Sequence, residues 1–474
     1  MFVRRVADIL PMGRQNPDFE TRRTTVKKLV GLFAATRIML LAAGPFENAV
    51  LHGETDKACA IDYAPGEEMV FTLSLQGAGT FAPDEFYVEW SRIGDDGLAE
   101  NGKVDAKSLP LVIKTKLEQP GFVRILACVV DKKGNECKKH FSGDFTTPEG
   151  RKALNAFERT DRRIFFDGGA GVRVDELRSV PEPVDFDEFW TKRKARLAKV
   201  PMVATVKEQK SNNPTLRILT FSVLCAGPRP VTGWVTIPTE TTKKYPALIS
   251  FHGYGSHFVQ PIPHDGPTDK IHMYINAHGY ELGREDEYYT ELYNSIKSNG
   301  KTFGLDSDWQ NKSTDTAYFG WMIYRIARAL QYLKSFPEWD GKNLRASGGS
   351  MGGLQAIWAA GIDSDVNEAT PEIPWCCDMG GRESLKRMRP DWGVGETEAM
   401  RYFDPVNFAK RISPKCRVEI TRAGLGDYCC PPSGIAVFYN NLNCPKKINW
   451  VQGATHGYVP KERHQTFSLT SNWD

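Results

Sequence analysis

The pentapeptide Gly348-Gly349-Ser350-Met351-Gly352 is the feature that most constrains this chain, because it lies between an expected strand at 343–347 and an expected helix at 354–360. Glycines around a serine permit a turn too sharp and crowded for larger side chains, with a strained serine backbone. Such a turn lifts the hydroxyl above the sheet edge and points N–H groups at the helix start toward whatever the hydroxyl attacks. The context predicts a nucleophile elbow with Ser350 as the nucleophile.

A serine nucleophile needs a base that takes its proton and an acid that orients the base. In the α/β-hydrolase arrangement the chain order is Ser, then Asp or Glu, then His. Two histidines follow Ser350: His456, in a short loop after an expected strand at 447–451, and His464, in a charged segment typical of a solvated surface. We therefore expect His456 to be the base.

One expected strand lies directly before the His456 loop, and another strand precedes that one in the chain. The orienting acid is expected just after this earlier strand. Residues 417–423 have the composition of that strand, and Gly424-Leu425-Gly426-Asp427 follows it. Asp427 is the expected acid, although Asp is also common in turns. Asp404 is the alternative, and its place before Pro405 equally suits a helix N-cap.

An oxyanion hole needs two N–H donors. The backbone of Met351, directly after the nucleophile, is expected to supply one. The mostly apolar run at 246–251 is typical of a buried parallel strand and ends in His252-Gly253-Tyr254-Gly255, close to the H-G-G-G loop of esterases. We expect the backbone N–H of Tyr254 to be the second donor and His252 to brace this loop.

Composition bounds the remaining possibilities. A chain of 474 residues with 41% hydrophobic content can form two or three domains, and a net charge of +3 without a basic stripe argues against nucleic acid as a partner. The ten cysteines include no C-x-x-C pair, which argues against structural zinc, and we expect no metal or cofactor. The adjacent pairs Cys376-Cys377 and Cys429-Cys430 suit buried thiols, whereas a disulfide between Cys128 and Cys137 stays open.

Residues 1–50 are expected to be a leader or an export signal. The segment 21–27 contains paired arginines and precedes a largely apolar run at 29–44, as in twin-arginine signals, although Arg37 interrupts the run and Pro45 follows the best cleavage site. We expect export to the periplasm or the exterior, with a cytoplasmic location as the alternative. The run is too short and too charged to predict a stable membrane span.

The rest of the chain divides into two expected domains. Residues 51–150 contain short expected strands at 69–75, 86–90 and 121–130, which favour a small all-β, immunoglobulin-like sandwich. Residues 151–180 suit a polar connector. In residues 181–474 strands and helices alternate, which predicts an α/β fold with a mainly parallel sheet and helices on both faces. Within it, the aromatic-rich segment 256–318 suits a long irregular lid or binding wall.

From about residue 181 to 474 the chain resembles the acetyl xylan esterase and cephalosporin-C deacetylase family, carbohydrate esterase family seven. Matching motifs follow in family order: Phe186-Asp187-Glu188-Phe189-Trp190, His252-Gly253-Tyr254, the stretch 335–340 before the elbow, the elbow itself, Tyr402-Phe403-Asp404, Gly424-Leu425-Gly426-Asp427, Cys430-Pro431-Pro432-Ser433, Tyr439-Asn440 and Pro445-Lys446. The resemblance implies an α/β-hydrolase fold and removal of acetyl groups from acetylated oligosaccharide or polysaccharide such as xylan. Ser350, Asp427 and His456 fall on the family's triad positions.

The chain departs from the family pattern in three places. Met351 stands where the family usually has Gln, and the sequence around His278-Gly279 differs from the family motif. The expected sandwich is a domain that the family pattern does not include. Substrate size and the family's ring-like homo-oligomer therefore stay open. Two other interpretations also remain: another serine hydrolase of the same fold, acting on peptides or small esters, and a non-catalytic carbohydrate-binding protein.

Overall fold

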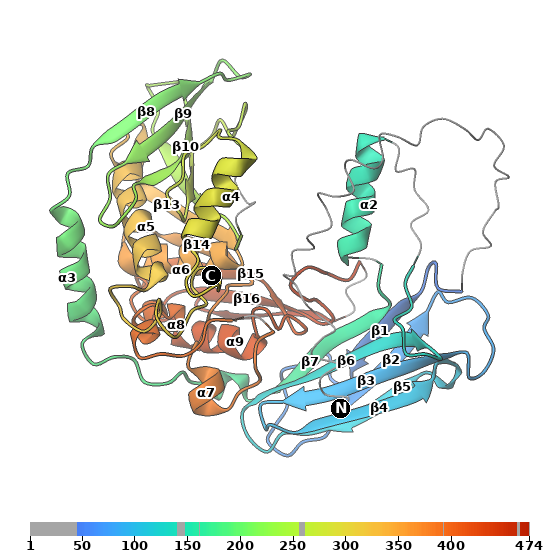
Figure 1. Cartoon of the computed structure of the whole chain (residues 1–474). Helices are drawn as coiled ribbons and strands as arrows, with labels where there is room; N and C mark the ends of the chain where they lie inside the picture. Colours follow the sequence, from blue (N-terminus) through green and yellow to red (C-terminus); the bar gives the residue numbers. More distant parts are fainter. Residues whose placement is uncertain are drawn as a thin grey trace, which may run out of the picture.

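The computed structural model describes residues 45–139, 147–160, 162–255, 261–391, 393–461 and 465–473. Most of the expected leader, and His464, lie outside these residues. The described chain forms a small unit of β-strands beside a larger unit of strands and helices (Figure 1). Among the described residues, no helix is long and apolar enough to cross a membrane.

The larger unit is built on one mixed sheet with the strand order β17-β16-β15-β14-β13-β11-β12-β10-β9-β8. The middle strands, from β16 to β12, pair in parallel, and the pairs at both ends of the sheet are antiparallel. The strands are β8 (Ala204–Gln209), β9 (Leu216–Val223), β10 (Val231–Pro238), β11 (Tyr245–Phe251), β12 (Ile271–Asn276), β13 (Trp339–Gly349), β14 (Glu368–Glu372), β15 (Arg417–Gly424), β16 (Lys446–Val451) and β17 (Thr466–Ser471). The expected α/β fold is confirmed.

Helices lie on both faces of this sheet and enclose its apolar core. Helix α5 (Tyr318–Lys334) carries apolar side chains at helical spacing toward this core, with Met322, Ile326 and Leu330 fully buried. The other helices are α3 (Phe186–Ala198), α4 (Asp286–Ser295), α6 (Met351–Ile362), α7 (Gly381–Leu385), α8 (Pro405–Ala409) and α9 (Pro432–Asn441), with short 3₁₀ turns at η4 (Val174–Glu176) and η5 (Ala399–Tyr402).

The small unit consists of two antiparallel sheets that share one hydrophobic core. One sheet has the order β1-β2-β5 and the other β4-β3-β6-β7. Their strands are β1 (Val50–Thr55), β2 (Met69–Gln76), β3 (Phe86–Gly94), β4 (Ala99–Asp105), β5 (Leu111–Thr115), β6 (Gly121–Asp131) and β7 (Phe165–Val172), with the 3₁₀ turn η3 (Ala106–Ser108) after β4 and helix α2 (Pro148–Thr160) before β7. Cys128 and Cys137 are both free thiols.

Two segments differ from the sequence expectation. Residues 165–172, expected in a polar connector, form β7, whose three glycines and one aspartate hide the usual strand signal. The segment 256–318, expected to be irregular, contains the sheet strand β12 and helix α4. Its tyrosines Tyr274, Tyr280 and Tyr289 are buried, so these rings contribute to packing instead of forming an open wall.

Candidate active site

Ser350 lies at the sharp turn between β13 and α6, as expected for an elbow. Its backbone has φ 58° and ψ −120°, a conformation that residues other than glycine rarely adopt. Two backbone hydrogen bonds join it to the segment at the end of β14, in addition to the first bond of α6: Ser350 N–H donates to Glu372 O at 3.0 Å, and Trp375 N–H donates to Ser350 O at 3.1 Å. A strained serine held from both sides is what an elbow requires.

The glycines of the pentapeptide are needed because backbones approach closely there. A Cβ at Gly348 would lie 2.6 Å from the Gly352 carbonyl carbon, and a Cβ at Gly352 would overlap the carbonyl of Phe251 at the end of β11. Larger residues at either position would push α6 away from the sheet. Because both positions are glycine, the amino end of α6 can lie directly against the loop after β11.

Asp427 and His456 are brought together by the loops that follow β15 and β16. His456 Nδ1–H donates to the Asp427 carboxylate, at 3.0 Å from Oδ2 and 3.3 Å from Oδ1. Asp427 is fully buried, while the His456 side chain is 20% exposed. A buried carboxylate on Nδ1 fixes the ring orientation and leaves Nε2 for other partners.

The electrostatics of His456 favour its cationic form. Burial lowers the pKa of His456, but hydrogen bonds to Asp427 and to the Cys429 thiol outweigh burial and raise it above its ordinary value. The Cys429 pKa moves the other way, to about 6, because of hydrogen bonds to Cys430 and to His456. The site therefore stabilises the imidazolium that forms when the ring takes a proton.

Glu372 connects the elbow to the His456 loop. The Ser350 N–H is bonded to the Glu372 carbonyl, and the Glu372 carboxylate accepts from Arg422 Nε at 2.7 Å. Arg422 in turn donates to the carbonyl of Thr455, next to His456, at 3.4 Å. Within the described chain no hydrogen bond joins the Ser350 and His456 side chains, and such bonds often tighten only when substrate binds.

The loop expected to complete an oxyanion hole runs beside the elbow, because a Cβ at Gly253 would lie 3.8 Å from the Gly349 carbonyl. His252 braces this loop as expected: its Nε2 accepts the Ala277 N–H at 3.0 Å, and Nδ1 contacts the Gly253 carbonyl. The Tyr254 ring stacks on Phe303 and fixes the loop from its other side. Met351 begins α6, so its N–H has no partner within the helix.

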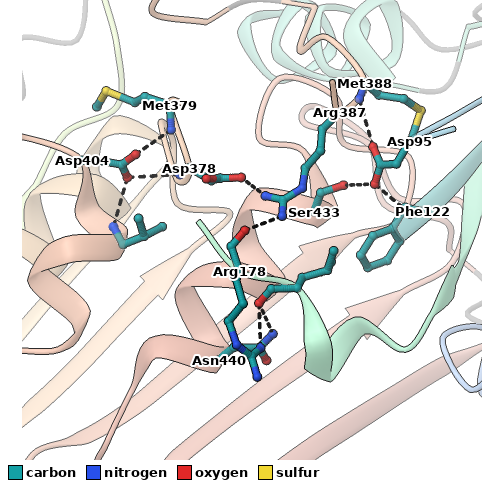
Figure 2. A network of polar contacts seen from close by, with 12 residues as sticks. Asp95, Phe122, Arg178, Asp378, Met379, Arg387, Met388, Asp404, Ser433 and Asn440 are labelled. Carbon is teal, nitrogen blue, oxygen red and sulfur yellow. Dashed lines mark hydrogen bonds and ion pairs between the residues drawn. The ribbon is translucent and has the colours of Figure 1, made fainter. Parts of the chain in front are cut away.

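The alternative acid, Asp404, has a different position and different partners (Figure 2). Its carboxylate accepts the N–H groups of Val406 at 3.1 Å, Asp378 at 3.1 Å and Met379 at 2.6 Å. Asp404 thus caps α8 and anchors the loop that contains Asp378. The structure places Asp427, not Asp404, on His456.

A cavity of about 180 Å³ opens next to the Asp427 loop. Its wall includes Trp375, Cys376, Cys377, Asp378, Arg387 and Cys429. Cys376 and Asp378 both have φ 62°, so a strained backbone segment forms one side. Cys429 belongs both to this wall and to the surroundings of His456, a connection that no sequence spacing predicted.

The small β unit supports the loops that carry Asp427 and His456. The Gln452 side chain, at the end of β16, accepts the Gly169 N–H at 2.9 Å and donates to the Gly169 carbonyl at 2.8 Å. Its oxygen also accepts the N–H of Gly453, at the start of the His456 loop. One buried amide thus joins β7 to that loop.

A second contact supports the Asp427 loop. Arg124 of β6 forms a buried ion pair with Asp167 of β7 and stacks over the ring of Tyr428, 4.1 Å from the ring centroid. A Cβ at Gly426 would overlap the Asp167 carbonyl. The residues on both sides of Asp427 therefore pack directly on the β unit.

Comparisons with known proteins identify the family to which the chain belongs. Residues 174–472 match the acetyl xylan esterase (AXE1) family. The chain is 29% identical over 279 residues to acetyl esterase Axe7A of Xylanibacter ruminicola, a match that spans 56% of this chain and 61% of that relative. Two solved acetyl xylan esterases, from Paenibacillus sp. and Thermoanaerobacterium sp., are each 22% identical and align over 60% of this chain and 93% and 92% of theirs, with TM-scores of 0.47 and 0.49. The matched span covers most of the chain, which therefore belongs to the acetyl xylan esterase family.

Proposed function

We propose that this protein is a serine carboxylesterase that removes acetyl groups from acetylated carbohydrate, either xylan or xylo-oligosaccharide. The observation that carries the proposal is the pair of His456 and buried Asp427 at the sheet edge where the strained Ser350 elbow lies, in a chain of the acetyl xylan esterase family. The acetyl esterase relative supports the choice of acyl group.

In this mechanism the Nε2 atom of His456 takes the proton of Ser350 Oγ as that oxygen attacks the acetyl carbonyl carbon. The N–H groups of Met351 and Tyr254 stabilise the oxyanion. The bond from the carbonyl carbon to the sugar oxygen breaks, and His456 gives its proton to that oxygen. Water then attacks the acyl-enzyme with His456 as base, which releases acetate and restores Ser350.

The β unit is proposed to be an immunoglobulin-like sandwich that supports the catalytic loops. Its sheet orders, β1-β2-β5 against β4-β3-β6-β7, match an A-B-E sheet facing a C′-C-F-G sheet. Its contacts to Gln452 and Tyr428 favour a supporting role.

The test compares the wild type with Ser350→Ala for acetate release from acetylated xylan and for hydrolysis of p-nitrophenyl acetate. The variant should lose about a thousandfold or more in rate on both substrates. Ser468→Ala, an exposed serine on edge strand β17, is the matched control and should hydrolyse both at the wild-type rate. Near-full activity of Ser350→Ala would disprove the mechanism, and wild-type activity on the small ester alone would exclude xylan as substrate.

A further inference from the structure

Three potential metal ligands meet beside the proposed triad. Cys429, Cys430 and His456 each offer a ligand atom, and these atoms lie within 4.8 Å of one another. The two thiols follow Asp427 in one loop, and the imidazole comes from the loop after β16. Neither cysteine is in a disulfide, and the hydrogen bond to Asp427 occupies only Nδ1 of the ring.

Asp427 orients all three groups at once. Its carboxylate accepts Nδ1–H of His456, and its Oδ1 also accepts the N–H groups of Cys429 at 3.1 Å and Cys430 at 2.9 Å. A carboxylate behind a histidine is the usual support of a metal-bound imidazole, because it fixes the tautomer with a free Nε2. The three residues that offer donor atoms are therefore held in place by hydrogen bonds to one buried carboxylate.

The chemistry of the donors selects the cation. Two thiolates and one imidazole are soft or borderline ligands that favour Zn²⁺, Cd²⁺ or Co²⁺ and disfavour Mg²⁺ and Ca²⁺. Cys430 is 1% exposed, whereas Cys429 and His456 are partly exposed, so a cation can enter from the His456 side. Three protein ligands leave the fourth tetrahedral position to water.

We propose that Cys429, Cys430 and His456 form an inhibitory site for a thiophilic divalent cation, so that cation binding and ester hydrolysis exclude each other. On binding, the protons still held by the two sulfur atoms and by Nε2 of His456 are released to solvent, and the cation forms bonds to both sulfur atoms and to that nitrogen. Because that nitrogen is the one that would take the Ser350 proton, the inhibition rests on the proposed function, whereas the metal site does not.

Cobalt absorption tests the site without reference to catalysis. The full chain, kept in a non-thiol reductant, is titrated with Co²⁺. Wild type and Ser350→Ala should both develop the intense charge-transfer and visible bands of tetrahedral thiolate-bound Co²⁺ at one equivalent, and Zn²⁺ should displace them. Cys429→Ser, at the partly exposed ligand, should weaken Co²⁺ binding at least tenfold.

Cys377→Ser is the matched control, because this thiol lines the adjacent cavity but is outside the ligand cluster. It should keep the wild-type bands. Bands that persist in Cys429→Ser, bands lost in Cys377→Ser, or a wild type without thiolate bands would each overturn the site.

Hydrolysis of p-nitrophenyl acetate tests the exclusion. One equivalent of Zn²⁺ should lower the wild-type rate at least tenfold, and a chelator should restore it. The rate of Cys429→Ser, relative to its own metal-free rate, should resist the same Zn²⁺ concentration. An unchanged wild-type rate under conditions where Zn²⁺ displaces Co²⁺ would overturn the exclusion. A metal-free wild type that hydrolyses no ester would instead disprove the proposed function, and the Co²⁺ bands would still decide the metal site.

Discussion

At the scale of single residues, two buried aspartates have different partners, and we propose different roles for them. Asp427 contacts the ring of His456, whereas the partners of the Asp404 carboxylate among the described residues are backbone N–H groups. Asp427→Asn should lower kcat by roughly a thousandfold or more, because an amide there favours the wrong imidazole tautomer. Steady-state kinetics on p-nitrophenyl acetate measures this loss.

Asp404→Asn is the control for that prediction. An amide nitrogen would face one of the donors Val406, Asp378 and Met379, so the variant should lose about 1–3 kcal/mol in free energy of unfolding. The residual folded enzyme should keep most of its kcat. If Asp404→Asn abolished turnover while Asp427→Asn did not, the assignment of the orienting acid would be reversed.

His272 makes stability depend on pH. Burial first, and then the charge of Lys270, lower the pKa of His272 to about 4, from its ordinary value near 6.5. Between these values the unfolded chain binds a proton that the folded chain does not, so this group destabilises the fold as the pH falls. The stability that the neutral His272 ring contributes is fully present above about pH 6.5 and is lost near pH 4.

His272→Gln should remove this dependence and can keep the hydrogen bond to Ser250 Oγ. The wild type should lose roughly 3 kcal/mol relative to the variant between about pH 7 and pH 4. Urea unfolding of both proteins at each pH gives the difference, in which the other titrating groups cancel. Parallel stability curves for the two proteins would contradict the prediction.

The three residues of the proposed triad could be identified from sequence because local spacing and chain order mark each of them. Ser350 is marked by its glycines, and Asp427 and His456 by their places after successive strands, so local spacing and chain order were enough. Cys429 was missed because its neighbourhood with His456 depends on how two distant loops close around one carboxylate. No local pattern carries that kind of information.

At the scale of elements, β7 was not predicted as a strand for the same reason, because its residues are determined by contacts with other segments. Strands with alternating apolar residues, such as β2 and β3, were predicted from their own sequences. Glycine is required in β7 because other backbones approach it closely. A Cβ at Gly169 would lie 2.5 Å from the Val123 carbonyl and 3.2 Å from the Leu425 carbonyl. The first contact comes from the neighbouring strand β6 and the second from the large unit, and neither is recorded in the sequence of β7 itself.

If β7 positions the His456 loop, Gln452→Leu should impair catalysis. Leucine leaves the buried N–H and carbonyl of Gly169 unpaired, and the loop that begins at Gly453 loses its anchor. We expect kcat to fall by up to about a hundredfold through misplacement of the imidazole. Kinetics at saturating substrate, on variant shown to be folded by circular dichroism, measures this effect.

Gln465→Leu is the matched control, since this amide also joins the two units, from the start of β17 to Thr55 of β1, without a bond to Gly453. It should cost about 1–3 kcal/mol in stability with kcat nearly unchanged. Equal kcat losses in the two variants would mean that loop positioning is not specific to Gln452.

At the scale of the whole molecule, the two units share buried polar contacts and should unfold together. Asp95, at the end of β3, accepts the Phe122 N–H at 2.8 Å within the β unit (Figure 2). The same carboxylate accepts the Met388 N–H at 2.9 Å and the Ser433 hydroxyl at 2.8 Å from the large unit. A buried acceptor shared in this way makes the folding of each unit depend on the other.

Asp95→Ala should uncouple the units, because it leaves those three donors buried without an acceptor. We expect a loss of about 3 kcal/mol or more, and unfolding curves from tryptophan fluorescence and far-ultraviolet circular dichroism that no longer coincide. Asp62→Ala, at an exposed aspartate of the same unit, should leave both curves superimposed at the wild-type midpoint. A single unshifted transition in Asp95→Ala would show that the two units are held together by their apolar contacts, such as that of Phe122 with Trp450.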